Sequence, residues 1–355
     1  MSGLHFHPLR IREIHADGDD ALVLSFDVPP ELAQTFRFEP GQHLTLRHPE
    51  LAGDLRRSYS ICAGAGEPLR VGVRRVNGGA FSSWLHAHAA PGQVMDVMEP
   101  QGRFGAALSA HTPRHALGIA GGSGITPILS IMKTLLARDA TSRFTLLFGN
   151  RLAATTMFKE ELEDLKNHYL TRLALHPVFS REVVDSPLNT GRLDADKLKQ
   201  FMRLIGHVDE AFICGPHAMN DEAEVALLAA GMAAEHVHVE RFGVPPELAA
   251  QPLVDVQEGD ASSARITIVR DGVTREIGFQ TSDGNVLAAA ARAGLDVPFS
   301  CKSGVCATCR AKLVQGQVRM ARNFALEKSE VAAGFILTCQ SHPLTERVVV
   351  SVDER

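Results

Sequence analysis

The chain has 355 residues, a length that fits two or three domains better than a single core. Hydrophobic residues make up 45% and charged residues 22%, an ordinary globular balance that excludes wholesale disorder. The net charge of −5 and the lack of a basic run interleaved with aromatic residues argue against a nucleic-acid partner.

The first ten residues contain no apolar core of the kind that a secretory signal needs. No stretch reaches the roughly 18 uninterrupted apolar residues of a membrane helix. The most apolar segment, 116–137, is interrupted by Gly121, Gly122, Gly124 and Pro127. We therefore expect a cytoplasmic protein without a membrane partner.

Residues 1–110 are expected to form an antiparallel β-barrel, because short alternating runs are separated by Gly and Pro. A short helix is expected to open near Phe81. The expected strands include 21–28, 43–47, 69–76 and 94–98.

The tetrad Arg57-Ser58-Tyr59-Ser60 falls on a further strand of this segment. Alternation puts Arg57 and Tyr59 on one face, where the ring could stack on an isoalloxazine and the guanidinium could meet a pyrophosphate. A surface Arg beside a half-buried Tyr is the alternative. The run Gly78-Gly79-Ala80-Phe81-Ser82 adds a glycine-rich helix start with a hydroxyl, which suits a phosphate.

Residues 111–243 alternate between strand and helix patterns, which predicts a doubly wound parallel sheet. Thr126 is expected to cap a helix whose first residue is Pro127. The expected strands are 115–120, 144–148, 173–179, 211–214 and 236–240, and the other expected helices are 157–169, 195–205 and 219–230.

Glycines gather at the first strand-to-helix turn, Gly121-Gly122-Ser123-Gly124-Ile125-Thr126-Pro127. Such a turn can cradle a pyrophosphate, although a tight turn without a ligand has the same composition. The second and third strands end in Arg151 and Ser180-Arg181, with no carboxylate for a ribose diol. This favours NADPH over NADH, unless the two arginines are only solvated surface charges.

The fourth strand of this segment ends in Cys214-Gly215-Pro216. Ligands of open α/β folds bind at this edge, so the thiol could abut the reacting carbon of a nicotinamide. A structural role for Cys214 is equally open.

A linker is expected over 244–263, which holds prolines and four acids but no base. A third domain is expected over 264–355, with a hairpin around Asp271-Gly272 and a helix over 286–292 followed by Gly294 as its left-handed cap. Strands are expected at 310–314, 335–339 and 347–352.

Four cysteines of the third domain follow the pattern C-x4-C-x2-C…C, as Cys301, Cys306, Cys309 and, after 29 intervening residues, Cys339. This is the ligand spacing of plant-type 2Fe–2S clusters. Small residues inside the loop let backbone N–H groups approach the sulfurs. Structural zinc, the alternative, usually takes two C-x2-C pairs or Cys with His. Cys62 is expected to be an apolar filler.

In chain order these motifs, with E-R-F at 240–242, resemble the ferredoxin–NADP reductase superfamily fused to a C-terminal plant-type 2Fe–2S ferredoxin domain. Within that superfamily, R-R-x-Y-S-I-C (56–62), D-E-A-F-I-C-G-P (209–216) and C-K-x-G-V-C-A-T-C (301–309) are similar to the reductase subunits of phenylacetyl-CoA epoxidases. The resemblance implies FAD in the barrel, a nicotinamide on the parallel sheet and the cluster in a β-grasp fold.

The resemblance also implies a role for each residue. For FAD, Tyr59 would pack on the flavin, Ser60 would bond near its N5, and the pyrophosphate would meet Arg57, Ser82 and the Gly79 backbone. Phe81 would also belong to the FAD site. For the nicotinamide nucleotide, Gly121, Gly122, Gly124 and Thr126 would hold phosphates, Arg151, Ser180 and Arg181 the adenosine end, and Cys214 and Gly215 the nicotinamide. The cluster would take Cys301, Cys306, Cys309 and Cys339.

The expected activity is that of an oxidoreductase for electron transfer, because hydride comes as an electron pair, a cluster accepts one electron, and a flavin handles both. The expected acceptor is the di-iron oxygenase of phenylacetyl-CoA epoxidase in phenylacetate degradation. Two alternatives stay open. The acceptor could be another aromatic or steroid oxygenase, or the chain itself could be a non-catalytic electron carrier or a zinc-stabilised adaptor. Residues 264–355 hold 12 Lys/Arg against 9 Asp/Glu, so an acidic docking face is not expected.

Overall fold

The computed structural model describes residues 4–110, 112–249 and 257–354. Its internal contacts divide the chain into two units. The first comprises Met1–Phe6, Leu55–Ser58 and Gly243–Arg355, and the second comprises His7–Asp54 and Tyr59–Phe242.

The N-terminal part of the chain builds a six-stranded sheet in the order β4-β3-β6-β1-β2-β5, with helix α1 (Ala80–His88) between β5 and β6 in the chain. Its strands are β1 (Phe6–Asp17), β2 (Ala21–Asp27), β3 (His43–Arg47), β4 (Arg56–Ser60), β5 (Arg70–Arg74) and β6 (Val94–Met98). The β1/β2, β2/β5 and β3/β6 pairs are antiparallel, which confirms the predicted class of sheet.

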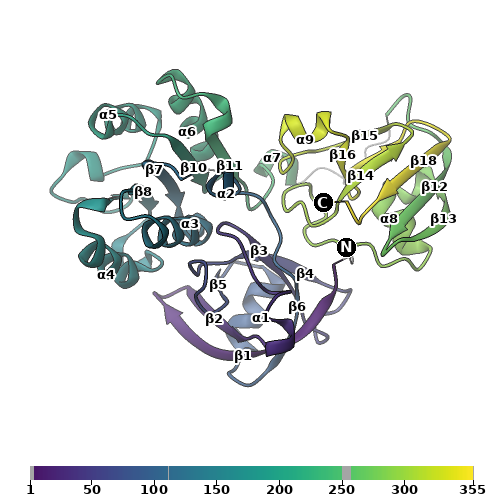
Figure 1. Ribbon diagram of the computed structural model, residues 1–355, viewed down its shortest axis with the longest axis horizontal. Helices are drawn as coiled ribbons and strands as arrows, with labels where there is room; N and C mark the ends of the chain where they lie inside the picture. The colour runs from purple at the N-terminus through teal and green to yellow at the C-terminus, as the bar shows by residue number, and fades with distance from the viewer. Residues whose placement is uncertain (1–3, 111, 250–256, 355) are drawn as a thin grey trace. The chain divides into compact units, whose positions relative to one another are not determined.

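A five-stranded parallel sheet follows, in the order β11-β10-β7-β8-β9. Its strands are β7 (His115–Gly121), β8 (Arg143–Asn150), β9 (Leu173–Phe179), β10 (Glu210–Cys214) and β11 (Val237–Glu240). Its helices are α2 (Ala107–Ala110), α3 (Ile125–Arg138), α4 (Lys159–Tyr169), α5 (Ala195–Ile205) and α6 (His217–Ala229). Helices α3 and α4 lie on one side of the sheet and α5 and α6 on the other (Figure 1), so the predicted doubly wound architecture is confirmed.

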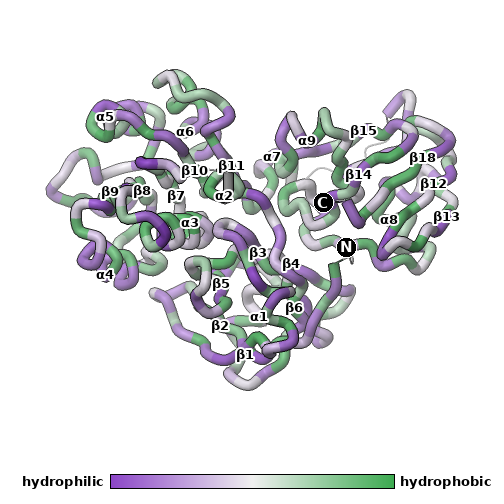
Figure 2. The backbone as a smooth tube through the Cα atoms, viewed as in Figure 1, coloured by the Kyte–Doolittle hydropathy of each residue, from purple (hydrophilic) through white to green (hydrophobic). Residues whose placement is uncertain are grey.

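Each face of this sheet covers its own hydrophobic core. On the α5 side, the amphipathic helix α5 turns Leu198 and Phe201 inward, and hydrophobic and hydrophilic residues alternate along its tube in Figure 2. On the α3 side, the core includes Ala21, Val23 and Cys62 from the antiparallel sheet. The antiparallel and parallel sheets of the second unit therefore share one core.

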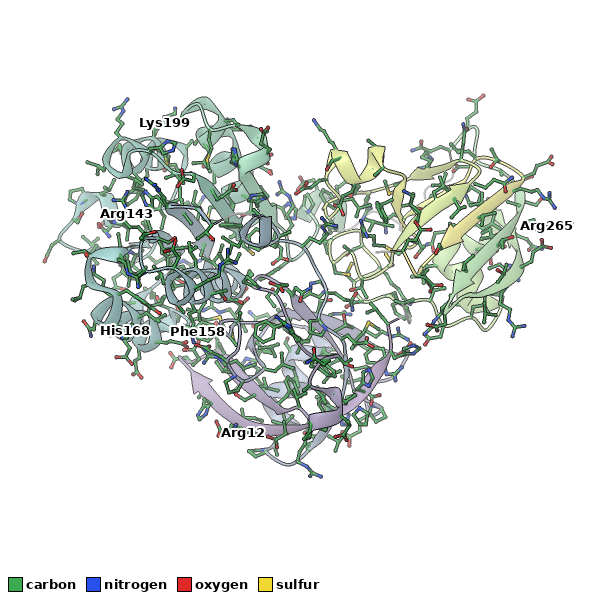
Figure 3. All side chains as sticks on the ribbon, in the orientation of Figure 1. Arg12, Arg143, Phe158, His168, Lys199 and Arg265 are labelled. Atoms are coloured by element: carbon green, nitrogen blue, oxygen red, sulfur yellow. The ribbon has the colours of Figure 1, made fainter. Side chains whose placement is uncertain are left out.

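Polar contacts also join the two sheets where α4 begins. Both carboxylate oxygens of Asp17 accept the Phe158 N–H, at 2.9 Å. Phe158, labelled in Figure 3, has a left-handed backbone (φ 56°) and is almost fully buried, and its ring lies against Gly72. Glu161 on α4 pairs with Arg70 and, at 2.8 Å, with Lys133.

The start of α3 differs from the expectation. The helix begins at Ile125 with Gly124 as its N-cap, and Thr126 lies inside the first turn, where its hydroxyl donates to the Ser123 carbonyl at 2.9 Å. The predicted cap at Thr126 was therefore wrong. A 3₁₀ turn over Gly122–Gly124 runs straight into the α-helix and leaves no room for an extended capping residue.

The C-terminal part of the chain forms a mixed sheet in the order β13-β12-β18-β14-β16, in which β12 and β18 are parallel, beside a small β15/β17 ladder. The strands are β12 (Ser263–Arg270), β13 (Val273–Gln280), β14 (Arg310–Gln315), β15 (Val318–Met320), β16 (Phe335–Leu337), β17 (Ser341–Pro343) and β18 (Arg347–Ser351), and the helices are α7 (Pro246–Ala249), α8 (Val286–Arg292) and α9 (Lys328–Ala332).

The predicted hairpin is confirmed, with both Asp271 (φ 53°) and Gly272 (φ 71°) left-handed as a type I′ turn requires. Gly294 also takes the expected left-handed backbone after α8 (φ 75°). The segment expected to be a linker contains α7, and its residues 250–256 lie outside the described part of the chain. No helix among the described residues is both long enough and apolar enough to cross a membrane.

Candidate functional site

Two turns meet at the carboxyl edge of the parallel sheet, one after β7 and one after β10. A Cβ atom on Gly124 would lie 1.9 Å from the Cys214 carbonyl oxygen. A Cβ atom on Gly215 would lie 3.0 Å from the backbone of Gly121. These glycines are thus required because two backbones touch, a packing reason that does not itself call for a ligand.

The same turn still presents groups that could hold an anion. Gly122 (φ 54°) and Ser123 remain partly exposed at the start of α3, a helix of 14 residues whose N-terminal end favours negative charge. The Arg74 guanidinium lies beside Gly122, since a Cβ there would be 2.9 Å from Nη1. Arg74 is held by Asp20 at 3.1 Å and was not singled out from the sequence.

The candidate residues for the adenosine end come together at the ends of β8 and β9. The Ser180 N–H donates to the Asn150 carbonyl at 2.9 Å, and the Arg181 N–H donates to the Arg151 carbonyl at 3.0 Å. Ser180, Arg151 and Arg181 are all exposed. Two cationic side chains on adjacent strand ends could bind a phosphate together.

The candidate flavin residues of the second unit lie in the first turn of α1 or close to it. The half-buried Tyr59 ring lies 6.0 Å from the buried Phe81 ring. Gly79 is the N-cap of α1, and the Ser82 hydroxyl accepts the Val76 N–H at 3.1 Å. As an acceptor the Ser82 hydroxyl shapes the turn before α1, and its O–H, 3.5 Å from the Gly79 carbonyl, is the donor that a phosphate would need.

Arg57 is exposed and lies two residues before Tyr59 in β4, so strand geometry places the two on one face. Its guanidinium donates to the Arg56 carbonyl at 2.7 Å. Contacts assign Arg57 to the first unit and Tyr59 to the second.

Glu240 is a residue to which the sequence motifs gave no role. It ends β11, and its carboxylate lies 3.5 Å from the Ser60 hydroxyl. Burial raises the pKa of Glu240 to about 8, so this carboxyl carries a proton at neutral pH. Its position at the end of the fifth parallel strand, on the ligand-binding edge, was the available signal.

Cys214 lies in the core beneath this edge and is fully buried. Burial, with a smaller contribution from Glu240, raises the pKa of its thiol well above the usual value. Cys214 is therefore a neutral thiol. Cys62 is likewise buried, with its pKa raised to about 12 by burial, as expected for a filler.

Strand β11, which carries Glu240, is fixed by a buried carboxylate. Glu210 at the start of β10 accepts from His236 at 2.7 Å and from His238 at 2.6 Å. The Asn220 amide donates to the Glu240 carbonyl at 3.1 Å. The edge strand is thus tied to β10 and α6 at both ends, which fixes the position of the Glu240 carboxyl.

The four candidate cluster cysteines come together in the first unit as two pairs. Hydrogen-bonding contact joins the sulfurs of Cys301 and Cys306, and of Cys309 and Cys339. Two irons with two thiolates each require this arrangement. No three or more His, Cys, Asp or Glu side chains among the described residues gather in the way that a single metal ion needs.

Backbone N–H groups point at these sulfurs. The Ser303 N–H lies 3.4 Å from Cys301 Sγ, and the Cys301 N–H lies 3.5 Å from Cys306 Sγ. Left-handed residues turn the loop, namely Lys302, Gly304 and Ala307 with φ of 54°, 82° and 53°. A loop of donors around four thiols fits an anionic iron–sulfur cluster.

Three protein families match successive parts of the chain. They are described as the oxidoreductase FAD-binding domain over residues 8–105, the oxidoreductase NAD-binding domain over 119–224 and the 2Fe-2S iron-sulfur cluster binding domain over 268–344. Domains for all three expected cofactors are therefore present, in the expected order.

The chain is similar over its whole length to components of oxygenase systems. It is 44% identical to one of the subunits of the 1,2-phenylacetyl-CoA epoxidase of Escherichia coli K12, over 99% of this chain and 98% of that protein. It is 35% identical to the ferredoxin reductase component of 3-ketosteroid-9-alpha-monooxygenase of Mycobacterium tuberculosis, over 99% and 97%. Phthalate dioxygenase reductase shares the fold, with a TM-score of 0.61, 23% identity and 98% of each chain covered.

The contact between the two turns predicts that an added methyl group is far more damaging at Gly124 than at Gly149. In Gly124→Ala the new methyl group would overlap the Cys214 carbonyl, so we expect the free energy of unfolding to fall by about 1–3 kcal/mol and nicotinamide oxidation to fall at least tenfold. Gly149→Ala is the matched control at the end of β8, because its nearest neighbour would be 3.6 Å away. Equal melting temperatures and rates for the two variants would contradict the steric argument.

The raised pKa of Glu240 predicts a pH-dependent stability. A carboxyl whose pKa is higher in the folded protein stabilises the fold fully below about pH 4.5, and this contribution disappears as pH rises through about 8. Glu240→Gln stays neutral, so its melting temperature should exceed that of the wild type by a few degrees above pH 8, with the gain shrinking on acidification. The exposed Glu235→Gln is the control. A pH-independent offset for Glu240→Gln would refute the assignment.

Proposed function

Because this chain belongs to the family of oxygenase reductases that join FAD-, NAD- and 2Fe–2S-binding domains, we propose that it delivers electrons from NADPH or NADH to the di-iron oxygenase subunits of a phenylacetyl-CoA epoxidase. The observation that carries this choice of acceptor is the 44% identity to the epoxidase protein of Escherichia coli along nearly the entire length of both chains.

Three parts of the chain each bind one cofactor. Residues 1–110 hold FAD, residues 111–243 hold the nicotinamide nucleotide, and residues 264–355 hold the cluster. A bound flavin takes two electrons from the nicotinamide as hydride and releases them one at a time to a one-electron carrier. The protein binds the flavin and the nicotinamide nucleotide, orients them toward each other and supplies a proton.

On the flavin side, Tyr59 packs on the ring and Phe81 supports it from the core. Ser60 bonds near the reacting edge of the ring. Arg57, Gly79 and Ser82 meet the pyrophosphate. Glu240 holds a proton at its carboxyl, and this proton moves to Ser60 Oγ, 3.5 Å away, only as the Ser60 hydroxyl releases its own proton toward the flavin. The buried, neutral Cys214 keeps this edge dry and uncharged.

On the nicotinamide side, Gly121, Gly122, Gly124 and Thr126 form the turn that receives the phosphates, and Gly215 keeps the facing turn clear. Arg151, Ser180 and Arg181 take the adenosine end. Two exposed guanidinium groups favour a 2′-phosphate, and hence NADPH, and the Glu182 carboxylate in the same region is engaged by the Ala153 N–H at 2.8 Å.

In the C-terminal part, Cys301, Cys306, Cys309 and Cys339 ligate the cluster as thiolates. The pairing of Cys301 with Cys306 and of Cys309 with Cys339 supports this set. A reductase for a steroid oxygenase is the second candidate, favoured by the 35% identity to the ketosteroid monooxygenase component.

The acceptor is tested by reconstitution. The purified chain, loaded with FAD and iron, should support epoxidation of phenylacetyl-CoA by the oxygenase subunits of a phenylacetyl-CoA epoxidase when NADPH is supplied. Cys339→Ser should lose at least tenfold of this coupled activity while reducing ferricyanide at the wild-type rate. Ferricyanide reduction without any epoxidation by the wild type would rule out this acceptor and leave the steroid oxygenase to be tested.

The nucleotide preference is tested by reversing one charge. In Arg181→Glu we expect KM for NADPH to rise roughly tenfold with little change for NADH, since one charge-assisted hydrogen bond to the phosphate is lost. Arg203→Glu, an exposed residue of α5, is the matched control. If Arg181→Glu left KM for NADPH unchanged, Arg181 would not be the discriminating contact.

A further inference from the structure

The side chain of Gln340 lies beside the candidate cluster ligands. It follows Cys339 directly and is 2% exposed. Its Nε2 atom is 3.5 Å from Cys339 Sγ, 3.0 Å from the Lys302 carbonyl and 2.9 Å from the Cys339 carbonyl. The carboxamide therefore bridges the cysteine loop and the segment that supplies the fourth thiol.

The surroundings fix Gln340 in this position. Its carbonyl accepts the Ala321 N–H at 2.8 Å, which secures its backbone. Gly304 lies against its side chain, since a Cβ there would be 3.2 Å from the Gln340 Cγ. The amide is thus held between the loop and Cys339, and a rotamer that removes the N–H from the sulfur would have to displace packed neighbours.

The donor on Cys339 differs in kind from those on the loop. The N–H groups near Cys301 and Cys306 belong to the backbone, so only proline, which would also disturb the loop, removes them. The N–H near Cys339 belongs to a side chain and can be removed while the backbone stays in place.

We infer that Gln340 is a positioning residue that raises the reduction potential of the 2Fe–2S cluster by donating a hydrogen bond to the Cys339 thiolate. The inference rests on the proposed function, in which Cys339 is a ligand. Reduction brings one electron from the flavin to the cluster and breaks no bond, and the added negative charge is shared by the sulfurs. The Gln340 Nε2 has two hydrogens for three acceptors, so the hydrogen near the sulfur is shared with a backbone carbonyl. A donor placed in this way on a ligand sulfur stabilises the reduced state more than the oxidised one.

Gln340→Met tests the inference, because it keeps an unbranched side chain of similar length and removes both N–H groups. We expect the equilibrium constant for cluster reduction to fall roughly tenfold, which is about 59 mV for a one-electron couple. The potential is measured by anaerobic titration with the reduced cluster followed by electron paramagnetic resonance. Ferricyanide reduction through the flavin should stay at the wild-type rate.

Thr338→Val is the matched control on the other side of Cys339. Thr338 is 1% exposed, and its hydroxyl donates to the Cys309 carbonyl at 3.1 Å, so the substitution removes a buried hydrogen bond that does not end on sulfur. We expect its cluster to keep the wild-type potential. A wild-type potential in Gln340→Met, or an equal shift in both variants, overturns the inference.

Gln340→Glu covers the case in which the methionine variant does not retain iron. Glutamate has nearly the same shape but replaces the donor by an acceptor, so the potential should fall at least as far, and an unchanged potential again overturns the inference. Failure of the proposed function looks different. Without a cluster the wild-type protein itself shows no 2Fe–2S signal, and with another acceptor it shows the signal but supports no epoxidation.

Discussion

The contact between two backbones at the carboxyl edge of the parallel sheet determines the geometry around it. Gly124 meets the Cys214 carbonyl and Gly215 meets the backbone of Gly121, at distances that any side chain would violate. Because the two turns touch, α3 begins directly after β7 and its first N–H groups face the edge where ligands of such sheets bind. Strand β11, beside β10, then brings Glu240 to the same edge. The proposed hydride-transfer site depends on this steric fit.

The two units place their ionisable groups in opposite electrostatic environments. In the second unit, burial keeps the Glu240 carboxyl and the Cys214 thiol protonated, so these two groups carry no charge. In the first unit, N–H donors converge on cysteines that must lose their protons to bind iron. A site that exchanges hydride benefits from a neutral, dry surface, whereas a site that stores one electron benefits from donors that offset added negative charge.

Much of the architecture could be predicted because the sequence carries local signals. The Asp271-Gly272 turn, the alternation of strands and helices over 111–243 and the cysteine spacing each dictate a local geometry, and the structure has all three. Strand β1 was not predicted because only Leu9 and Ile11 of its 12 residues are buried, so its alternation is weak. Glu240 and Gln340 were assigned no role for another reason. Glu240 contacts Ser60, 180 residues away, and the Gln340 amide is held beside the adjacent Cys339 by the Lys302 carbonyl, 38 residues away, so no local pattern records these arrangements.

The order of the cysteines along the chain has a consequence for biosynthesis. Three thiols lie within one loop, but the fourth, Cys339, comes after the whole second unit and after most of the first. Domains fold as they emerge from the ribosome, so the flavin- and nicotinamide-binding parts can be complete while the iron site still lacks a ligand. Cofactor insertion is therefore ordered in time, with flavin available to bind first and iron and sulfide last. A translation product that stops before Cys339 would accept reducing equivalents and have no cluster through which to discharge them.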